Sequence, residues 1–441
     1  MNKLKKYHII TFGCQMNEHD SERMAGLLQA EGYLPADGPE AADVVLVNTC
    51  SVRQKADHKA YSLLGRLGGL KDKRQDMIIG VCGCMAQSQR EEVLRRAPYV
   101  DLVLGTHNLD HLPRLLRQVE QARLPQVEVL DEAISPAATL DNLPRNDPRH
   151  AWVTIMQGCN NFCTYCIVPY VRGRERSRPI ADIVREVEGL SASGYKEVTL
   201  LGQNVNSYGN NGGQGADFVR LLECLNQING LARIRFVTNH PKDLSPGLIT
   251  AMAGLDKVCE QIHLPVQAGS DRILRIMNRG YTQAEYLAKI RALRERIPHI
   301  SITTDIMVGF PGETEEDFEQ TLHVVREARF DSLFSFIYGD RPNTVASKLE
   351  PKIPKQAALP RFDRLIALAQ QISAENHAQA VGRQVEVLVE GPSKNNPAKL
   401  TGRTRTNKLV HFEGSADLIG SLIQVHIIRA AKNCYIGKLA G

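Results

Sequence analysis

Short apolar runs alternate with longer amphipathic stretches through the first third of the chain. Tyr7 to Gly13, Asp43 to Thr49 and Met77 to Gly83 are apolar and β-prone, and each precedes a polar stretch that is compatible with a helix. Alternating strands and helices are typical of a parallel sheet. We therefore predict an α/β protein whose N-terminal part, residues 1–135, is a Rossmann-like parallel-sheet domain. The segment from Arg123 to His150 contains four prolines and no sustained periodicity, which predicts a linker.

Six more strand-like runs lie between residues 146 and 377, and amphipathic helical stretches separate them. Six strand–helix units predict a central partial (β/α)6 barrel, in which active sites gather at the carboxyl ends of the strands. The six runs are Trp152–Met156, Glu197–Leu201, Ile234–Thr238, Gln261–Val266, Ser301–Val308 and Ser332–Tyr338.

The end of the chain changes to alternation with a period of two. Behind a helix-like stretch from Pro360 to Ala380, four runs alternate at strand period, with turn residues between them. We predict a small all-β barrel over residues 378–441. The four runs are Gln384–Glu390, Leu409–Glu413, Leu422–Arg429 and Cys434–Lys438.

Composition indicates a globular protein of several domains, since 43% of the 441 residues are hydrophobic and 23% are charged. No apolar run approaches the roughly 20 residues that span a bilayer, and the basic start of the chain does not have the pattern of a signal peptide. We therefore expect a cytoplasmic protein without a membrane partner. In the reducing cytosol, ten cysteines indicate metal sites rather than disulfides.

The formal net charge of +5 is concentrated in the predicted C-terminal barrel. From Arg383 onward, nine lysines and arginines stand against four acidic residues, a balance of +5. A small basic barrel is typical of RNA-binding proteins, which use phosphate attraction and surface shape. The alternative is a basic face without a nucleic-acid partner.

Three cysteines follow the first strand of the predicted central barrel. Cys159, Cys163 and Cys166 have the spacing C-x3-C-x2-C, which lets three thiolates face one centre. A structural zinc site normally has four protein ligands, so three ligands favour a 4Fe-4S cluster whose fourth iron is open to a small molecule. The alternative is a zinc site completed by one of three other residues: His150, Cys224 or Cys259.

Three further cysteines stand where the first three predicted strands end. They are Cys14, Cys50 and Cys84. Because ligands of parallel sheets bind beyond the carboxyl ends of the strands, these thiols can meet at a second metal centre. The alternative is that they are small buried apolar residues, since free cysteine is among the most buried residue types.

The cysteine motif at residues 159–166, with Tyr165 before its third cysteine, resembles that of the radical S-adenosylmethionine (SAM) enzymes. The stretches at 13–17, 48–53 and 83–87 resemble the N-terminal domain of the methylthiotransferases, a subgroup of that family. This resemblance implies two 4Fe-4S clusters. Cys159, Cys163 and Cys166 would hold the cluster that binds and cleaves SAM, and an auxiliary cluster on the other three cysteines would take part in sulfur delivery.

The same resemblance implies further contacts. The last 60 or so residues resemble the TRAM domain of tRNA-modifying members, so tRNA is an expected partner, together with an electron-donor protein such as flavodoxin or ferredoxin. The residues expected near SAM are Tyr165, Gly202, Gln203, Asn204, Gln267, Asp305 and Gly309. The residues expected to contact tRNA are Arg172, Arg174, Arg176, Arg403, Arg405 and Lys408, although a solvated charged turn would also explain the first three.

The resemblance also implies a reaction, the addition of a methylthio group to carbon 2 of an isopentenylated adenosine beside a tRNA anticodon. An aromatic C–H has no acidic proton and no leaving group, so cofactor chemistry must supply the driving force. The residues at 15–18 and 51–53 resemble the group that acts on isopentenyladenosine. Alternatives within the family are threonylcarbamoyladenosine in tRNA and an aspartate of a ribosomal protein. The alternative from another class is a non-catalytic RNA-binding protein with structural zinc.

Overall fold

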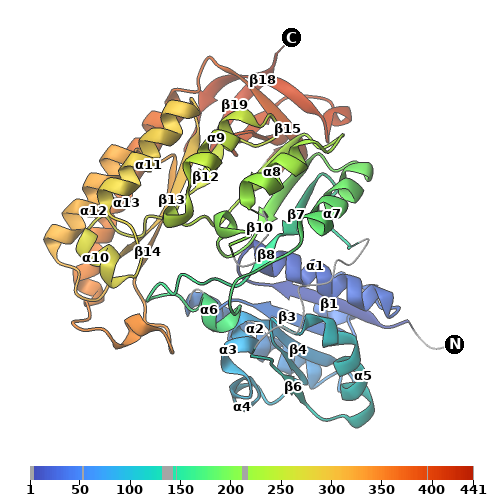
Figure 1. Ribbon diagram of the computed structural model, residues 1–441. Coiled ribbons are helices and arrows are strands. Elements are labelled where there is room, and N and C mark those ends of the chain that lie inside the picture. The colour runs from blue at the N-terminus through green and yellow to red at the C-terminus, as the bar shows by residue number, and fades with distance from the viewer. Residues whose placement is uncertain are drawn as a thin grey trace.

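Helices cover both faces of a parallel sheet in the N-terminal domain of this computed structural model, which describes residues 4–51, 54–131, 143–145, 147–210, 217–394 and 396–440 (Figure 1). The domain comprises β1 (Lys6–Thr11), α1 (Gln15–Ala30), β2 (Leu34–Pro35), β3 (Val44–Thr49), α2 (Gln54–Lys71), β4 (Ile78–Gly83), α3 (Cys84–Gln89), α4 (Glu92–Arg96), β5 (Leu102–Leu104), α5 (Leu112–Ala122) and β6 (Gln126–Glu128). The strand order is β2-β1-β3-β4-β5-β6, so the winding direction reverses between β1 and β3. Ligands of doubly wound sheets bind beside such a reversal.

Alternation along the central strands builds two apolar layers in this domain. Val45 and Val47 of β3 pack with residues of α2, α3 and α4, whereas Val44 and Leu46 pack with residues of α1 and α5. Burial on both faces is typical of parallel strands and explains their continuous apolar character. The three predicted strands are confirmed as β1, β3 and β4, because this character marks them clearly.

The short edge strands β2, β5 and β6 were not predicted, because two or three residues are too few to show a period. Strand β6 lies inside the stretch that the prolines predict as a linker, so the linker prediction begins too early. Residues 132–142 and 146 of that stretch, including Pro136, lie outside the described residues.

Six parallel strands form the central domain. They make two three-stranded sheets, β7-β10-β11 and β12-β13-β14, and a parallel bridge between Ile234 and Val258 joins the two. Within the described part of the chain β7 and β14 do not pair, so the barrel is open, and the predicted partial (β/α)6 architecture is confirmed. The strands are β7 (His150–Thr154), β10 (Glu197–Leu201), β11 (Arg233–Phe236), β12 (Gln261–His263), β13 (Ser301–Val308) and β14 (Ser332–Ile337), with a small ribbon of β8 (Met156–Gln157) and β9 (Arg176–Ser177).

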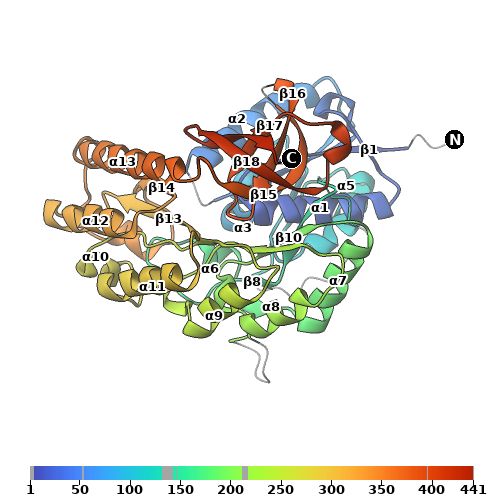
Figure 2. The same ribbon diagram turned by 90° about the horizontal axis from the view of Figure 1, so that it is seen from above.

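Helices pack on the outside of the central strands (Figures 1 and 2). Several start at side-chain caps: Thr282 and Thr314, for example, each form a capping box that ties the first turn of the following helix to the residue before it. The helices are α6 (Val168–Val171), α7 (Ile180–Ala192), α8 (Phe218–Asn226), α9 (Pro246–Gly254), α10 (Asp271–Ile276), α11 (Gln283–Arg296), α12 (Glu315–Ala328) and α13 (Lys355–Ala378).

The C-terminal domain is a closed five-stranded barrel, which confirms the predicted small all-β module. Its strands are β15 (Gln384–Ser393), β16 (Asn396–Thr404), β17 (Leu409–Phe412), β18 (Leu422–Ala430) and β19 (Cys434–Leu439). Strand β16 was missed, because its sequence includes Pro397 and Gly402 and does not alternate. Gly402 is needed where it stands, since a Cβ there would lie 2.3 Å from the carbonyl oxygen of Leu388 on β15.

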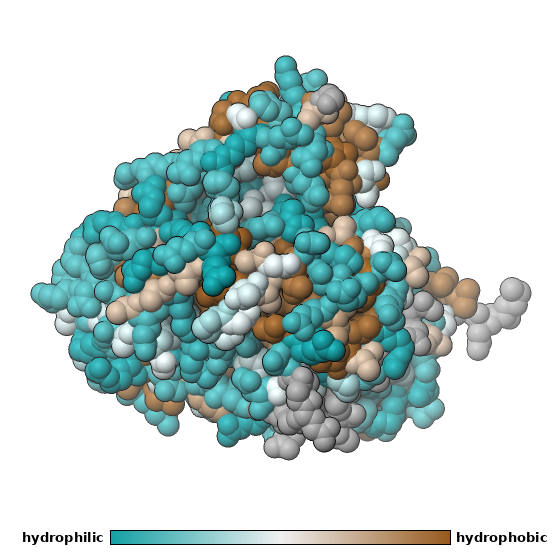
Figure 3. All heavy atoms as spheres, turned by 45° about the horizontal axis from the view of Figure 1, so that its top comes forward, coloured by the Kyte–Doolittle hydropathy of each residue, from teal (hydrophilic) through white to brown (hydrophobic). Residues whose placement is uncertain are grey.

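The C-terminal barrel and the N-terminal domain contact different ends of the central domain (Figures 1 and 2). On the face seen in Figure 3, hydrophilic residues predominate and the hydrophobic ones lie in separate patches. None of the described helices is both long and apolar enough to cross a membrane.

Candidate functional site

The loop of residues 158–166, here called the cluster loop, follows β7 and β8 at the carboxyl end of the first barrel strand. Gly158 has a φ of +79°, and a Cβ on it would lie 2.0 Å from the carbonyl oxygen of Arg174. The amide of Cys159 donates a hydrogen bond to the carbonyl oxygen of Gly173 at 3.1 Å. The loop is therefore held against residues 173–174, and only glycine fits its first position.

The three thiols of the cluster loop lie in one buried region. Cys159 and Cys163 are 9% and 8% exposed. Burial raises the pKa of Cys159 to about 11, and burial together with the neighbouring Cys163 raises the pKa of Cys166 to about 12. Each of these cysteines affects the pKa of another, so the three are neighbours and are candidates to hold one cluster together.

Polar groups surround Cys163. The Arg279 Nη1 donates to Cys163 Sγ at 3.2 Å and to the hydroxyl of Tyr165 at 3.3 Å, and His240 Nε2 lies 3.9 Å from the same sulfur. Burial first, and then the charge of Arg279, holds the pKa of His240 far below its usual value, so the ring is neutral. Tyr165, predicted to lie near SAM, is thus beside the cysteine ligands. Arg279 was not singled out from the sequence, because a lone arginine carries no recognisable motif.

The loop after β10 contacts the cluster loop directly. Gln203 Oε1 accepts a hydrogen bond from the amide of Gly158 at 2.5 Å, so this predicted SAM residue also supports the cysteines. Asn204 is 2% exposed and donates to Asp243 Oδ2 at 2.7 Å, while its Oδ1 has no partner among the described residues. A buried amide oxygen without a partner is costly, which marks Asn204 as a candidate ligand contact. Gly202 has a packing reason instead, since its Cβ would lie 2.5 Å from Met156.

The predicted SAM residues after β12 and on β13 lie at the same end of the barrel. Gln267 is buried with a φ of +71°, and its amide donates to the carbonyl oxygen of Asp305 at 2.9 Å. Asp305 Oδ2 lies 3.5 Å from His263 Nε2. Gly309 makes room for α13, since its Cβ would lie 2.8 Å from the Cβ of Ala358. Helix packing therefore explains Gly309 without a ligand, whereas Gln267 and Asp305 remain candidate contacts.

Glu175 is a buried carboxyl beside the cluster loop that sequence reasoning missed. Its amide donates to Asn160 Oδ1 at 3.2 Å, which places it next to that loop. Burial raises the pKa of Glu175 to about 7, so its charge changes near neutral pH. The only signal in the sequence was one acid within a run of arginines, which looks like a solvated turn.

The three strand-end cysteines of the N-terminal domain stand at the carboxyl edge of adjacent strands. Cys14 follows β1, Cys50 follows β3 and Cys84 begins α3 directly after β4. Cys50 and Cys84 are each 5% exposed, whereas Cys14 is exposed. A Cβ on Gly13 would lie 3.2 Å from Cys50 Sγ, and Cys14 contributes to the rise in the pKa of Cys84 that burial causes. The structure therefore brings these thiols to the topological reversal of the sheet.

A segment of the central domain forms one wall of this second thiol group. Ile167 and Val171, at the two ends of α6, pack with Cys84 in one buried cluster. The hydroxyl of Thr106 donates to the carbonyl oxygen of Val171 at 2.5 Å, which fixes the segment on the N-terminal domain. The helix α6, labelled in Figure 1, starts two residues after Cys166 and packs with Cys84, so it is next to both groups of cysteines.

Arg172, which the sequence predicted to contact the phosphates of tRNA, is bonded to other residues of the protein. It is 3% exposed, its Nη2 lies 2.7 Å from Asp20 Oδ2, and it donates to Asn17 Oδ1 at 2.9 Å. The charge of Arg172 also opposes the rise in the pKa of Cys84. This arginine joins two domains beside the strand-end cysteines. Arg174, by contrast, is exposed and lies over the ring of Phe162 at 4.3 Å, and Arg176 is half-buried in β9.

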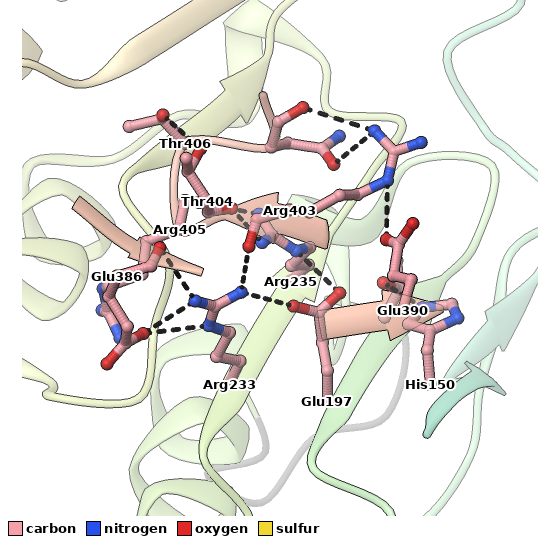
Figure 4. A network of polar contacts seen from close by, with 12 residues as sticks. His150, Glu197, Arg233, Arg235, Glu386, Glu390, Arg403, Thr404, Arg405 and Thr406 are labelled. Atoms are coloured by element: carbon pink, nitrogen blue, oxygen red, sulfur yellow. Dashed lines mark hydrogen bonds and ion pairs between the residues drawn. The ribbon is translucent and has the colours of Figure 1, made fainter. Parts of the chain in front are cut away.

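Residues 403–408, here called the β16–β17 turn, dock on the central domain (Figure 4). Arg405 donates to both oxygens of Glu260, at 2.8 and 3.0 Å, and to the carbonyl oxygen of Val258 at 2.7 Å. Lys408 Nζ lies 3.5 Å from Asp331 Oδ1 and 3.1 Å from His377 Nε2. Arg405 and Lys408, which the sequence predicted to contact tRNA, are therefore bonded to residues of the protein itself.

Two buried arginines on β11 of the central barrel also bind the β16–β17 turn. Arg233 is fully buried, lies 2.8 Å from Glu386 Oε1, and donates to the carbonyl oxygen of Arg403 at 2.8 Å (Figure 4). Arg235 donates to the carbonyl oxygens of residues 404 and 405, both at 2.7 Å. Arg403 is the most exposed of the three basic residues of the turn: its side chain is 41% exposed and pairs with Glu390 at 3.0 Å. Arg233 begins β11, so the turn closes the amino ends of the barrel strands, opposite the cluster loop.

None of the three residues that the sequence suggested as a fourth zinc ligand lies at the cluster loop in the described part of the chain. His150 begins β7, at the other end of the barrel, and hydrogen-bonds to Thr199 Oγ1 at 2.8 Å. Cys224 lies on α8, and Cys259 lies beside Arg235 at the C-terminal barrel. Among the described residues, no three or more His, Cys, Asp or Glu side chains are arranged to hold a single metal ion. The choice between the two kinds of centre therefore rests on ligand number: each set has three cysteines, as an open 4Fe-4S cluster needs, whereas structural zinc normally has four ligands.

Three family models match the three domains. The Radical SAM superfamily matches residues 153–325, an uncharacterized protein family, UPF0004, matches residues 6–105, and the TRAM domain matches residues 378–440. The match to the radical SAM superfamily implies SAM and a 4Fe-4S cluster as cofactors. The domain boundaries predicted at residues 135, 146 and 378 remain predictions.

Relatives match along the whole chain. The tRNA-2-methylthio-N(6)-dimethylallyladenosine synthase of Desulforamulus reducens is 51% identical, over 100% of this chain and 96% of that protein. The protein of the same name from Moorella thermoacetica is also 51% identical, over 97% of this chain and 96% of its own length. Among solved structures, the radical SAM methyltransferase TsrM from Kitasatospora setae has a TM-score of 0.58 at 15% identity, covering 78% of this chain and 77% of that chain, which shows a shared fold.

Proposed function

Because the chain belongs to the family of tRNA-2-methylthio-N(6)-dimethylallyladenosine synthases, to judge by 51% identity over its full length, we propose that it is a tRNA methylthiotransferase. It adds a methylthio group to carbon 2 of N6-dimethylallyladenosine, an isopentenylated adenosine beside the tRNA anticodon. The target base has to leave its stack to reach the barrel, as bases do in enzymes that modify them.

The observation that carries this proposal is the wall shared by the two groups of cysteines. Ile167 and Val171 pack against Cys84, and both follow Cys166 by only a few residues. The two groups of cysteines are therefore neighbours. A protein that only binds RNA has no need of two adjacent groups of three cysteines. A reaction that both activates a carbon and delivers sulfur needs two centres within reach of one substrate.

The cofactors of the proposed enzyme are two 4Fe-4S clusters and SAM. Cys159, Cys163 and Cys166 would hold the first cluster, which would supply an electron for SAM cleavage, and Cys14, Cys50 and Cys84 would hold the second, which would take part in supplying sulfur. The protein positions the ligands and excludes water: Gly158 lets the loop approach Arg174, Gln203 holds the amide of Gly158, and Arg172 holds the second group of thiols against the barrel.

SAM contacts are proposed at the carboxyl ends of the barrel strands. Asn204 supports this placement through its buried oxygen without a described partner, and Gln267 and Asp305 lie at the same end. Tyr165 lies beside Cys163 through their common partner Arg279.

We propose fewer tRNA contacts than the sequence predicted. Arg174 is exposed beside the cluster loop, and Arg403 is the most exposed basic residue of the β16–β17 turn. Both can attract phosphate, and Arg174 can also stack with a base. An electron-donor protein such as flavodoxin or ferredoxin is a further proposed partner, since the clusters must be reduced.

The test is nucleoside analysis by mass spectrometry of tRNA from a bacterial strain that lacks its own methylthiotransferase. The chain should restore the methylthio form of isopentenyladenosine, and a Cys163→Ala variant should not. Appearance of methylthio-threonylcarbamoyladenosine, or of a modified ribosomal-protein aspartate instead, would assign a different target.

Metal analysis of anaerobically prepared protein tests the cofactors separately. Two clusters correspond to about eight irons and eight sulfides per chain. Joint replacement of Cys14, Cys50 and Cys84 by alanine should halve both counts, preserve SAM cleavage and abolish thiolation. Zinc without labile sulfide would instead indicate a non-catalytic RNA-binding protein.

A further inference from the structure

Arg279 is a buried cation that donates hydrogen bonds to a carbonyl oxygen, two tyrosine hydroxyls and a thiol sulfur. It is 4% exposed and lies in the turn after α10. Its Nη2 donates to the carbonyl oxygen of Pro265 at 2.7 Å and its Nε to the hydroxyl of Tyr281 at 3.0 Å. The remaining nitrogen, Nη1, points to Cys163 Sγ at 3.2 Å and to the hydroxyl of Tyr165.

No carboxylate pairs with Arg279 among the residues that the structure describes. Other buried arginines of the chain have such partners: Arg172 pairs with Asp20, and Arg233 pairs with Glu386. A guanidinium stays protonated in proteins, and burying it without an opposite charge is costly. A negative charge placed beside Arg279 would therefore be strongly favoured.

Cys163 is the group that can supply the balancing charge. Tyrosine hydroxyls are neutral at pH 7, and a carbonyl oxygen carries only a partial charge. A thiol that coordinates a metal is deprotonated outright, so cluster loading places a negative charge 3.2 Å from Arg279 Nη1. The cation and its anion then meet only in the loaded protein.

The turn around Arg279 is attached to the cluster loop at several further points. The amide of Thr164 donates to the carbonyl oxygen of Met277 at 3.1 Å, and its hydroxyl donates to that of Ile276 at 3.0 Å. From the other side, Asn278 Nδ2 donates to the carbonyl oxygen of Asn161 at 3.0 Å. These bonds hold the guanidinium at a fixed distance from the sulfur, so its effect does not depend on a mobile side chain.

We propose that Arg279 is the built-in counter-charge of the 4Fe-4S cluster on Cys159, Cys163 and Cys166, and that it sets the reduction potential of that cluster. A positive charge and an N–H···S hydrogen bond both stabilise the more negative, reduced state, which raises the potential. Arg279 is thus a positioning residue that acts through Cys163. The inference rests on the radical SAM domain alone and holds whichever substrate the enzyme modifies.

The test is a redox titration of the reconstituted full-length protein, followed by electron paramagnetic resonance in the absence of SAM and tRNA. Arg279→Gln removes the charge and Arg279→Lys keeps it. The matched control is Arg275→Gln, because Arg275 is an exposed arginine of α10, the helix just before Arg279. A chain in which Cys14, Cys50 and Cys84 are alanine identifies the signal of each cluster.

We expect Arg279→Gln to make reduction of the first cluster at least tenfold less favourable, which is a potential lower by about 59 mV for one electron. In Arg279→Lys the potential of the first cluster should fall by less than half as much. That potential should be unchanged in the control variant, and the potential of the second cluster should be unchanged in every variant. An Arg279→Gln protein with a full cluster and an unchanged potential would overturn the proposal. So would an equal fall in both clusters, since that would indicate a general effect on folding.

If glutamine prevents cluster loading, Arg279→Lys decides the question alone. A lysine variant that loads about four irons at this site and stays close to the wild-type potential supports the counter-charge. A lysine variant that loads its cluster but falls tenfold or more overturns it, since charge would then not be the property that matters. If neither variant loads the first cluster, while the second cluster and the circular dichroism spectrum are normal, Arg279 is needed for cluster assembly. That outcome would also overturn the proposal that it sets the potential.

Discussion

Replacement of Arg405 by alanine should loosen the C-terminal barrel without changing how phosphate is attracted. Arg405 donates three hydrogen bonds to Glu260 and one to the carbonyl oxygen of Val258. The substitution removes all of them and leaves Glu260 without this partner. If Arg405 contacted tRNA instead, the same substitution would mainly weaken RNA binding.

The magnitude follows from the burial of the pair. The side chains of Arg405 and Glu260 are 22% and 33% exposed, which lies between a buried ion pair and a surface one. Breaking a buried pair costs about 3–5 kcal/mol and an exposed one about 0–1, so we expect about 2 kcal/mol here. This corresponds to about 30-fold more frequent opening of the β16–β17 turn, since each 1.4 kcal/mol is tenfold.

Hydrogen–deuterium exchange of residues 400–412 measures that opening directly. Arg403→Ala is the matched control, because Arg403 belongs to the same turn but its side chain is 41% exposed. Its loss should cost less than about 1 kcal/mol and accelerate exchange less than about fivefold. The salt dependence of tRNA binding, measured on both variants, separates docking from phosphate contact.

The opposite pattern would refute this reasoning. A true phosphate contact reduces the slope of log affinity against log salt by about one when it is removed. If Arg405→Ala lowered that slope and left exchange unchanged, the ion pair with Glu260 would not hold the turn. Equal acceleration of exchange in both variants would show that burial is not what distinguishes them.

Three other substitutions test the site. Gly158→Ala should halve the iron content to about four per chain, because a Cβ would lie 2.0 Å from a carbonyl oxygen, and unchanged iron would contradict this. Arg172→Ala leaves the buried carboxylate of Asp20 unpaired and should cost about 3–5 kcal/mol of unfolding free energy in thermal or denaturant unfolding, whereas Arg174→Ala should be nearly neutral. Glu175→Gln should stabilise the metal-free protein by about 1–2 kcal/mol at pH 8 and by less than about 0.5 at pH 5. The sign follows because burial raises the pKa of Glu175 to about 7, so its ionised form destabilises the fold only as pH rises; equal effects at both pH values would contradict it.

The fold was predictable where burial imposes a regular pattern. Strands covered on both faces, such as β3, are apolar throughout, and the six barrel strands are each followed by an amphipathic helix. The pattern fails for β16, where Gly402 is required by the close approach of β15, and for β6, which has only three residues. In both places contacts with neighbouring strands, rather than local preference, determine the structure.

The candidate site was predictable through its cysteines but not through its arginines. Thiolate spacing and strand ends are local signals, and they place all six cysteines at two carboxyl edges. Positive charge has no such signal: Arg172 and Arg405 look like surface residues in the sequence, yet each pairs with an acid from another domain. Arg279 has no neighbouring motif at all, and only its distance to Cys163 reveals it.

The shortness of α6 limits how this chain can change during evolution. From Cys166 to Arg172 the chain runs through a single short helix, with a cysteine ligand at one end and a buried ion pair at the other. One inserted or deleted residue would turn everything beyond it by about 100° around the helix axis. Substitutions in this stretch can be tolerated where size and polarity are kept, but its length cannot drift. Alignments of functional relatives should therefore show gaps in the long outer loops and none between residues 159 and 178.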